Sequence, residues 1–366
     1  MPDVRIVLDA TPLLGHRTGI GAYTAHLLTE LPAALVRAGH EATVGVTTWT
    51  ARGGRLVDLP PGVRQVGPPS PARLLRAAWT RTDHPRVETL VGPCDVFHGT
   101  NFVSPPTRHA REVVTVHDLT YELHRTTVSA DALAYRELVP RALARGAQVV
   151  CPSQAVATAV QEFYGLGPDR VHATPLGVDP VWFEAQAPDA AARARLGLPA
   201  EYLLFVGSVD PRKNLGRLVR AHALARQADP ATPPLVLAGP AGRDTTTPDS
   251  AAVMRTGWLD EVDLRRLVAG ARALVLPSLD EGFGLPALEA LACGRPVLAA
   301  DIPALREVTG GLAVLADPYD EESLAHGLHQ VLSAADDDAA RQARRRHARP
   351  SSWARFADAT VSVYSG

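Results

Sequence analysis

The sequence predicts an α/β protein with two doubly wound domains, each built on a parallel sheet. Short apolar runs rich in Val, Ile and Leu alternate with helical patterns along both halves of the chain. Unbroken apolar strands of this kind occur where helices cover both faces of a parallel sheet. A length of 366 residues also exceeds what one ordinary hydrophobic core accommodates. We therefore expect two domains, each with its own core.

The first domain is predicted at residues 1–180 and the second at residues 198–349. Strands stop, and Pro and Ala accumulate, between residues 176 and 201, which places the boundary there. The expected strands of the first domain are residues 4–9, 42–47, 95–100, 112–118 and 147–153. Those of the second domain are residues 202–208, 234–240, 272–278, 295–300 and 311–317.

A last helix is predicted within residues 350–366, in the stretch "SWARFADATVSVY". Its apolar residues recur at helical spacing on one face, namely Trp353, Phe356, Ala357, Val361 and Tyr364. This helix follows the final strand and helix of the second domain, so it is free to pack elsewhere.

Composition excludes several classes of protein. A net charge of −2 gives no electrostatic reason to bind nucleic acid. No apolar run approaches the roughly 18 residues of a membrane span, and "MPDVRIVLDATPLL" lacks the pattern of a signal peptide, so a cytoplasmic location is expected. Cys94, Cys151 and Cys293 are odd in number and lack C-x-x-C spacing, which indicates small buried residues without disulfides or structural zinc.

Lys213 is the only lysine in a chain with 37 lysine and arginine residues. It follows a predicted strand and precedes a helix that Asn214 is expected to cap with its side chain. The helix dipole opposes Arg212 and Lys213 at this end by ~0.3–1 kcal/mol, unless an anion such as phosphate lies between them. The alternative is a solvated pair of cations that no ligand uses. Because the dipole opposes Lys213, its removal should leave the stability of the ligand-free protein unchanged or slightly higher.

A second loop with helix-start chemistry follows the strand at residues 272–278, in "SLDEGFGLPALEALACGRPV". Gly282 and Gly284 allow a tight turn and close approach to a ligand. Pro286 suits the first helical position, and Gly294 suits the position just after the helix. The short helix therefore directs free amides toward the carboxyl ends of the strands, where ligands bind in open α/β sheets.

Two carboxylates accompany this helix start. Glu281 lies on the loop and Glu289 lies one turn into the helix. Such acceptors can hold sugar hydroxyls while helix-start amides hold an anion. The alternative is that Glu281 satisfies the helix start and Glu289 is a surface carboxylate.

Four segments in this order resemble the retaining glycosyltransferases of family 4, which have the GT-B fold. They are "TGIGAY" (residues 18–23), "TVHDL" (115–119), "GSVDPRKN" (207–214) and the E-x7-E pair in "EGFGLPALE" (281–289). The terminal "SSWARFADATVSVY" is similar to the helix that crosses back onto the first domain in that family. The resemblance implies two Rossmann-like domains facing a central cleft, an acceptor-binding first domain and a second domain that binds a nucleotide sugar.

The resemblance assigns donor-binding roles in the second domain. Arg212 and Lys213 would bind the diphosphate of the donor. Glu281 would lie near the donor sugar, and Glu289 would accept hydrogen bonds from the ribose. The family often has a further arginine about five residues before the lysine, where this chain has Ser208.

Other donor contacts implied by the resemblance involve backbone groups. The amides that would hold the sugar and phosphates belong to Gly282, Phe283, Gly284 and Leu285. A region lining the nucleobase would span residues 257–264, beginning with Gly257, Trp258 and Leu259. A loop of the first domain that closes over the diphosphate would contain Gly19, Ile20 and Gly21.

His117 matches a histidine that lies near the reacting carbon in this family. By the same resemblance, the acceptor hydroxyl attacks the face of the sugar that the nucleotide leaves, and a donor phosphate oxygen helps to take its proton. No cofactor and no metal ion are expected, because no D-x-D segment follows a strand and the run Asp336 to Asp338 is predicted to be a solvated helix face.

Within this family, the segments "LDATPLLGHRTGIGAYT", "TVHDLTY" and "VDPRKN" look most like the branch rich in mannosyltransferases. GDP-mannose is therefore the first expected donor, with UDP- and dTDP-hexoses as alternatives. The acceptor is a hydroxyl of a glycan, a lipid-linked precursor or a small molecule; the sequence specifies neither which of these nor the oligomeric state. Residues 71–86 form a basic amphipathic pattern, which predicts either an ordinary packed helix or a contact with a membrane surface.

Two other functions fit the same architecture. A sugar-nucleotide epimerase would isomerise the donor without an acceptor, and a non-catalytic sugar-nucleotide-binding protein would bind the donor without turnover. A phosphorylase would need a lysine for its cofactor, and the only lysine is already assigned to the diphosphate.

Overall fold

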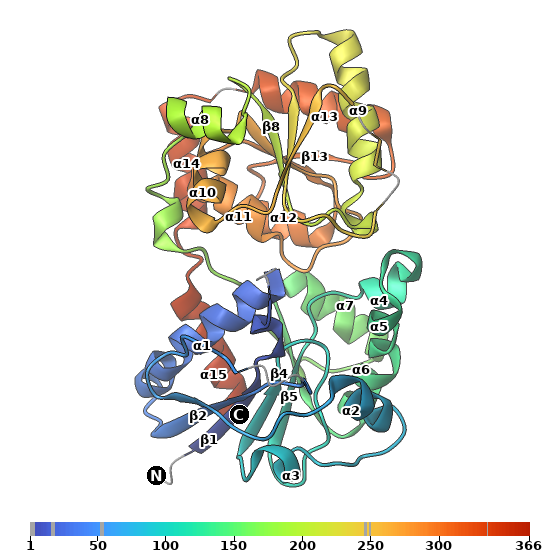
Figure 1. Ribbon diagram of the computed structural model, residues 1–366, viewed down its shortest axis with the longest axis vertical. Coiled ribbons are helices and arrows are strands. Elements are labelled where there is room, and N and C mark those ends of the chain that lie inside the picture. Colours follow the sequence, from blue (N-terminus) through green and yellow to red (C-terminus); the bar gives the residue numbers. More distant parts are fainter. Residues whose placement is uncertain (1–3, 16–18, 52–54, 245–246, 249, 335) are drawn as a thin grey trace. The chain divides into compact units, whose positions relative to one another are not determined.

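The structure is a computed structural model that describes residues 4–15, 19–51, 55–244, 247–248, 250–334 and 336–366. The chain divides into two compact units: unit 1 comprises residues 1–177 and 352–366, and unit 2 comprises residues 178–351. Each unit contains one sheet, whose strands are all parallel and whose two faces are covered by helices (Figure 1). The predicted fold class of two doubly wound α/β domains is confirmed.

The sheet of unit 1 has seven strands in the order β3-β2-β1-β4-β5-β6-β7. The chain adds strands on one side of β1 and then returns to add β4 on its other side. The point where the strand order reverses therefore lies between β1 and β4. The strands are β1 (Val4–Asp9), β2 (Ala42–Thr47), β3 (Val63–Gln65), β4 (Val96–Gly99), β5 (Arg111–Thr115), β6 (Gln148–Cys151) and β7 (Val171–Ala173).

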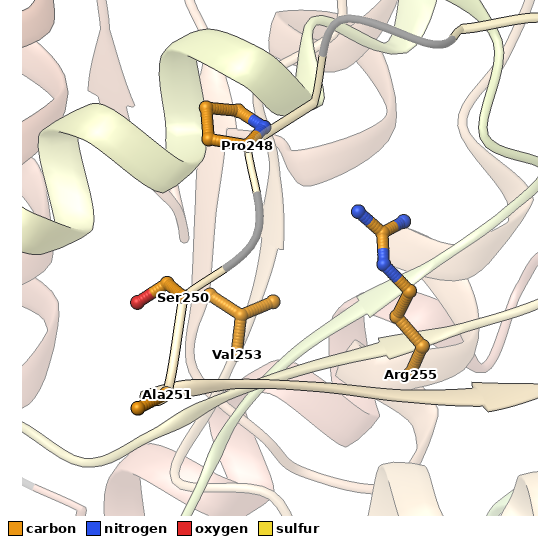
Figure 2. Close-up of a pocket in the computed structure, with 5 residues that line it drawn as sticks. All are labelled: Pro248, Ser250, Ala251, Val253 and Arg255. Carbon is orange, nitrogen blue, oxygen red and sulfur yellow. The ribbon is translucent and has the colours of Figure 1, made fainter.

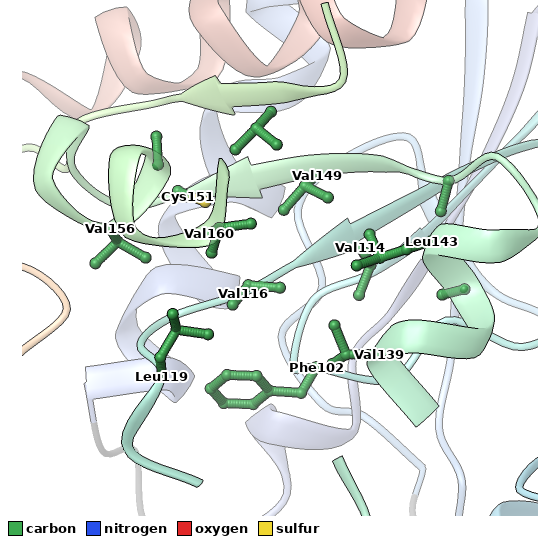
Figure 3. Close-up of a cluster of buried hydrophobic side chains, with 14 of the residues drawn as sticks. Phe102, Val114, Val116, Leu119, Val139, Leu143, Val149, Cys151, Val156 and Val160 are labelled. Carbon is green, nitrogen blue, oxygen red and sulfur yellow. The ribbon is translucent and has the colours of Figure 1, made fainter. Parts of the chain in front are cut away.

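The helices of unit 1 cover both faces of this sheet, and one buried apolar cluster fills the space between β5, β6 and the helices that follow them. Figure 3 shows valines of both strands, such as Val114 and Val149, packed against Val139 and Val160 of the helices. The helices are η1 (Thr11–Leu13), α1 (Gly19–Arg37), α2 (Ala72–Trp79), α3 (Glu88–Val91), α4 (Thr120–Leu123), η2 (Arg125–Thr127), α5 (Ala130–Leu133), α6 (Tyr135–Ala144), α7 (Gln154–Tyr164) and α15 (Trp353–Ser365).

The terminal helix α15 lies against α1, as predicted for a helix that returns to the first domain (Figure 1). All five residues predicted for its apolar face are buried. The indole of Trp353 stacks on the His26 ring of α1 at a centroid distance of 4.0 Å. Arg37 at the end of α1 donates to Asp358 at 2.7 Å. The last residues of the chain thus complete the core of unit 1.

The sheet of unit 2 has six strands in the order β10-β9-β8-β11-β12-β13, so its order reverses between β8 and β11. The strands are β8 (Leu203–Val206), β9 (Leu235–Ala238), β10 (Val253–Gly257), β11 (Ala273–Leu276), β12 (Val297–Ala300) and β13 (Val314–Ala316). The helices are η3 (Pro180–Trp182), α8 (Ala190–Leu196), η4 (Pro211–Lys213), α9 (Leu215–Ala228), α10 (Glu261–Gly270), α11 (Leu285–Ala292), α12 (Pro303–Thr309), α13 (Glu321–Ser333) and α14 (Asp338–Ala348).

Several simpler expectations can be compared with this fold. The three cysteines are free and buried, as expected for small apolar residues. Among the described helices, none combines the length and the apolar composition that crossing a membrane requires. The predicted helix within residues 71–86 is the shorter α2, whose Leu75 and Trp79 are buried while Leu74 is 70% exposed. Strands β3, β7 and β10 were not predicted; they lie at or beside sheet edges and are short or only partly buried.

The start of α15 lies very close to Gly177, which predicts that Gly177→Ala destabilises the protein. A Cβ at Gly177 would lie 2.2 Å from the Trp353 nitrogen and 2.3 Å from the Ser352 carbonyl carbon, both backbone atoms. We expect this substitution to lower the free energy of unfolding by about 1–3 kcal/mol, because the start of α15 must move to accommodate the methyl group. Urea denaturation followed by circular dichroism measures the change.

Gly167→Ala is the matched control. A Cβ there would come close only to the exposed side chain of Asp169, which can move away. Equal stability losses in the two variants would contradict the close backbone contact at α15.

Candidate active site

The loops that leave β8 and β11 meet where the strand order of unit 2 reverses. These two strands are neighbours in the sheet, and both run in the same direction. The loop after β8 ends in η4, which carries Arg212 and Lys213, and the loop after β11 carries Ser278 and Glu281. The structure therefore brings together side chains that are 68 positions apart in the sequence.

A buried salt bridge joins the two loops. The Lys213 Nζ donates to Glu281 Oε1 at 2.5 Å, and the Ser278 hydroxyl donates to the same oxygen at 2.7 Å. The Arg212 guanidinium lies 3.5 Å from Glu281 Oε2 and donates to the Asp280 carbonyl oxygen at 3.1 Å. Lys213 and Glu281 are only 9% and 8% exposed.

Charge and burial act in opposite directions on Glu281. Burial would raise the pKa of this carboxyl, but the charges of Lys213 and Arg212 outweigh burial and hold the pKa at about 2. Glu281 is therefore ionised at neutral pH. The anion that accompanies the two cations in this structure is a carboxylate of the chain itself.

This salt bridge changes the expected effect of removing Lys213. The sequence-based expectation considered only repulsion by the dipole of the following helix, and therefore no loss of stability. In the structure, the loss of Lys213 would leave the buried Glu281 with a weaker set of partners. Removing one partner of a buried ion pair is destabilising, because the other charge stays buried.

The expected capping role of Asn214 is wrong. Asn214 immediately precedes α9, but its side chain makes no cap hydrogen bond to that helix. Instead its Nδ2 donates to the carbonyl oxygens of Pro277 and Pro318 at 3.0 and 2.7 Å. Its left-handed backbone, with φ at 59° and ψ at 30°, differs from the extended conformation typical of a capping residue. Asn214 thus ties the loop after β8 to the one after β11.

The start of α11 has the local geometry that the sequence predicted. Gly284 precedes the helix in the left-handed region with φ at 96°, and a Cβ there would lie 2.5 Å from a methyl group of Leu305. Pro286 lies in the first turn, and Gly294 follows the helix with φ at 75°. The residues expected to offer amides, Gly282, Phe283, Gly284 and Leu285, directly follow Glu281 and lead into this helix.

Glu289 is neither fully exposed nor hydrogen-bonded. Its side chain is half-buried on α11, and among the described residues no hydrogen bond reaches its carboxyl group. Burial, together with the charge of Glu261, raises the pKa of Glu289 to about 8. This carboxyl group can accept hydrogen bonds from a ligand that supplies hydroxyl donors.

The other predicted donor residues also follow strands of unit 2. Ser208 comes after β8, where its hydroxyl donates to Asp210 Oδ2 at 2.5 Å. Gly257 is the last residue of β10, and its carbonyl oxygen accepts a hydrogen bond from Gly239. Trp258 is 46% exposed and Leu259 is partly buried.

In unit 1, His117 lies just beyond β5, two strands from β1. Its Nε2–H donates to the Thr100 carbonyl oxygen at 2.8 Å. The Thr100 hydroxyl in turn donates to the Asp9 carbonyl oxygen at 2.5 Å. The His117 ring thus lies beside the point where the strand order of unit 1 reverses, at the carboxyl end of the sheet.

Gly19, Ile20 and Gly21 were expected in a loop, which is wrong. They form the first turn of α1, and Ile20 packs against the buried cluster around Phe102. Thr18, the first residue of the same motif, lies outside the described residues. Glycine carries a helix-propensity cost of about 1 kcal/mol, which buried packing along the rest of α1 outweighs.

The acidic run near residue 336 is not a uniformly solvated face. Asp336 accepts hydrogen bonds from Arg341 and Arg344 at 3.0 and 2.7 Å. Asp337 caps α14 by accepting from the Ala340 amide at 2.8 Å. Asp337 and Asp338 are both exposed, as the sequence predicted, whereas Asp336 is partly buried.

Two contact residues, one in each unit, were not predicted from the sequence. Ser278 bonds Glu281, and Thr100 holds His117. Ser278 lies two residues after β11 and Thr100 lies directly after β4, at the carboxyl edge of each sheet, where ligands bind in open α/β folds. That position is the signal that could have identified them.

A separate cavity of about 440 Å³ lies beside the start of β10. It is lined by Pro248, Ser250, Ala251, Val253 and Arg255, and among these described lining residues Arg255 is the charged one (Figure 2). None of the predicted site residues lines it.

Comparison with known proteins identifies similar sequences for both halves of the chain. Residues 18–182 match the model for "Glycosyltransferase Family 4", and residues 200–334 match the model for "Glycosyl transferases group 1". The chain is 28% identical over 304 residues to the O-antigen chain mannosyltransferase B of Escherichia coli, covering 79% of this chain and 77% of that protein. It is 37% identical over 234 residues to a D-inositol 3-phosphate glycosyltransferase of Kineococcus radiotolerans, covering 56% and 53%.

The chain thus spans about half the length of that second relative. Among solved structures, sucrose-phosphate synthase from Thermosynechococcus elongatus has a TM-score of 0.73 at 21% identity, covering 99% of this chain and 98% of that one. The similarity at this identity concerns the fold. It confirms the predicted GT-B architecture of two Rossmann-like domains with a terminal helix that returns to the first.

The salt bridge predicts that Lys213→Ala destabilises the ligand-free protein. We expect a loss of about 3 kcal/mol in the free energy of unfolding at pH 7, because Glu281 stays buried without its shortest ion pair. Urea denaturation measures this loss. Arg220→Ala is the control, since its pair with Glu321 is exposed and such pairs contribute less than about 1 kcal/mol. A Lys213→Ala variant as stable as the wild type would show that the bridge contributes nothing.

Glu289 predicts a pH-dependent stability. Its pKa of about 8 in the folded state exceeds the ordinary value of 4.5, so the folded state holds this proton more tightly. The resulting stabilisation is complete below about pH 4.5 and is lost as the pH rises through about 8. We therefore expect the Tm of the wild type to fall relative to that of Glu289→Gln over this range. Thermal denaturation without nucleotide at several pH values tests this; a difference in Tm that is constant with pH would contradict it.

Proposed function

The chain belongs to glycosyltransferase family 4, and we propose that it transfers a hexosyl group from a nucleoside-diphosphate sugar to an acceptor hydroxyl, retaining the anomeric configuration. The observation that carries this proposal is the cluster of Arg212, Lys213 and Glu281 beside the start of α11. It combines two cations, a carboxylate and helix-start amides where the strand order of unit 2 reverses, which is where open α/β sheets bind ligands.

In this proposal the diphosphate binds to Arg212, Lys213 and the amides of residues 282–285. Glu281 holds Lys213 in place before the donor arrives, because their salt bridge and the Ser278 hydroxyl fix the ammonium and carboxylate together. The ammonium has three N–H groups, so it can keep this bridge and still donate to a phosphate oxygen. A donor site prepared in this way needs little rearrangement when the anion binds.

Glu289 and the segment after β10 would hold the nucleoside. The half-buried Glu289 carboxyl group, which no described residue bonds, matches the hydroxyl donors of a ribose. A ribose that donates to this carboxylate favours its ionised form, so binding near pH 7 should release a proton. Gly257, Trp258 and Leu259 would lie against the base.

The transfer step would use the donor's own phosphate as the base. The bond between the anomeric carbon and the diphosphate oxygen breaks, and its electron pair leaves with the diphosphate. The acceptor oxygen forms its bond to the same carbon from the same face. The acceptor proton passes to the departing phosphate oxygen. Arg212, Lys213 and the α11 amides stabilise the charge that develops on the leaving group.

His117 would act on the sugar rather than on the diphosphate. Its Nε2–H is committed to the Thr100 carbonyl oxygen, so the ring is held in one tautomer. Through its other edge the ring would position the reacting carbon. No nucleophile on the protein is required in this mechanism.

We propose that no metal ion takes part, because two cations and the helix-start amides can balance the diphosphate charge. GDP-mannose is the proposed donor, in line with the sequence pattern, and UDP- and dTDP-hexoses are its competitors. The acceptor hydroxyl would belong to a glycan, a lipid-linked precursor or a small molecule. A contact of α2 with a membrane surface, through Leu74 and neighbouring arginines, and a cytoplasmic location stay predictions.

A thermal-shift comparison in EDTA tests the proposed donor site. GDP, UDP and dTDP are added to the wild type and to Lys213→Arg, and the nucleotide that raises Tm most identifies the donor base. A ligand at 100 times its Kd raises stability by about 2.7 kcal/mol. We expect Lys213→Arg to reduce this shift, because a planar guanidinium cannot occupy the place of the ammonium without moving the diphosphate.

Transfer assays with the selected donor complete the test. We expect activity to survive EDTA and kcat to fall at least about ten-fold in Lys213→Arg, since a displacement of about 1 Å can cost a hundred-fold in rate. Arg220→Ala, on an exposed face of α9, is the control and should behave as the wild type. Activity lost in EDTA and restored by Mg²⁺ would refute the metal-free mechanism, and wild-type kinetics of Lys213→Arg would refute the role of the ammonium.

A further inference from the structure

A chain of buried hydrogen bonds connects the terminal helix α15 to the neighbourhood of His117. The Tyr364 hydroxyl lies 2.6 Å from His98 Nδ1, and His98 Nε2 lies 2.7 Å from the Thr115 hydroxyl. The Thr115 hydroxyl lies 2.8 Å from the Tyr23 hydroxyl. The four residues come from α15, β4, β5 and α1, and each is less than a tenth exposed.

The last member of this chain packs against His117. The Tyr23 ring meets the His117 ring edge to face, with centroids 5.0 Å apart and an angle of 89° between the planes. Phe102 meets His117 at 5.4 Å, and the Thr100 carbonyl oxygen fixes its Nε2. Tyr23, Phe102 and Thr100 therefore each constrain how the His117 ring lies. Thr100 is held by its hydroxyl bond to the Asp9 carbonyl oxygen, and Tyr23 by its hydroxyl bond to Thr115, which belongs to the polar chain.

Packing of the core alone does not explain why these four side chains are polar. Burying hydroxyl and imidazole groups costs free energy unless every group is bonded, and apolar side chains would fill the same space. Burial and the nearby His117 lower the pKa of His98 to about 3, so this ring is neutral and has one N–H. One ring nitrogen then donates and the other accepts, which makes each hydroxyl in the chain depend on the next.

We propose that Tyr364, acting through His98, Thr115 and Tyr23, is a positioning residue for His117. Its hydroxyl fixes the His98 ring, His98 fixes the Thr115 hydroxyl, and Thr115 fixes the Tyr23 ring against His117. The terminal helix thereby sets the orientation of a histidine far from it in sequence. This inference rests on the proposed function, in which His117 positions the reacting carbon.

Nuclear magnetic resonance tests the coupling without any substrate. The ring nitrogens of the histidines are observed in ¹⁵N-labelled wild type, Tyr364→Phe and Tyr23→Phe, and His117→Ala identifies the His117 signals. We expect the His117 nitrogen shifts to move in both tyrosine variants. Tyr202→Phe is the matched control, because it loses a buried hydroxyl that donates to Leu267 in unit 2. It should lower Tm to a similar degree and leave the His117 signals in place.

Kinetics test whether the coupling serves the reaction. With GDP-mannose, or the donor whose nucleotide raises Tm, we expect Tyr364→Phe to lower kcat about ten-fold and to leave the KM for the donor unchanged. In a His117→Ala background the same substitution should cause no further loss, because its effect passes through His117. A merely structural role would lower kcat equally in both backgrounds.

The outcomes separate the two proposals. If His117→Ala retains wild-type kcat, the proposed role of His117 is wrong and the positioning role falls with it. If His117→Ala is impaired but Tyr364→Phe has wild-type kcat or unmoved His117 signals, only the inference is wrong. If Tyr364→Phe does not fold, Tyr23→Phe breaks the same hydrogen-bond chain at its other end. The His117 nitrogen shifts and the kcat of that variant then test the inference in the same way.

Discussion

The reversal of strand order within each parallel sheet is the constraint on which the candidate site depends. Strands on the two sides of the reversal point are covered by helices on opposite faces, so the loops leaving them diverge and leave room for a ligand. In unit 2 this point lies between β8 and β11, and it brings Lys213 beside Glu281. In unit 1 it lies between β1 and β4, next to the Thr100 carbonyl oxygen that holds His117. Two separate sets of candidate site residues thus owe their position to one topological rule.

Electrostatics then decide what the site in unit 2 can bind. Glu281 and Glu289 are eight positions apart in one segment, yet their protonation states are opposite at neutral pH, because one lies beside two cations and the other is half-buried next to a further carboxylate. An ionised Glu281 keeps the ammonium of Lys213 charged and fixed. A protonated Glu289 carries no charge that would oppose an incoming polyanion. In the proposed donor complex, Glu281 would hold a cation for the diphosphate, and Glu289 would lose its proton only when the ribose hydroxyls bind.

Local chemistry accounts for what could be predicted from the sequence. The apolar strands and the apolar face of α15 follow from periodicity, and the turn before α11 follows from the special backbone freedom of Gly284. The salt bridge between Lys213 and Glu281 could not be predicted, because its partners lie on different loops and no local pattern couples them. Asn214 misled the prediction, since its side chain serves distant carbonyl groups instead of the adjacent helix. The salt bridge and the role of Asn214 both depend on tertiary contacts, which a single sequence does not display.

The position of α15 has a consequence for how the protein is made. Unit 1 is completed by the last helix of the chain, and the whole of unit 2 is synthesised in between. At about 5–20 residues per second, a ribosome needs on the order of ten seconds or more to translate that interval. During this time the apolar stripe of α1 that later receives Trp353 and Phe356 has no partner. The nascent first half must therefore remain incompletely packed until residues 352–366 have been synthesised.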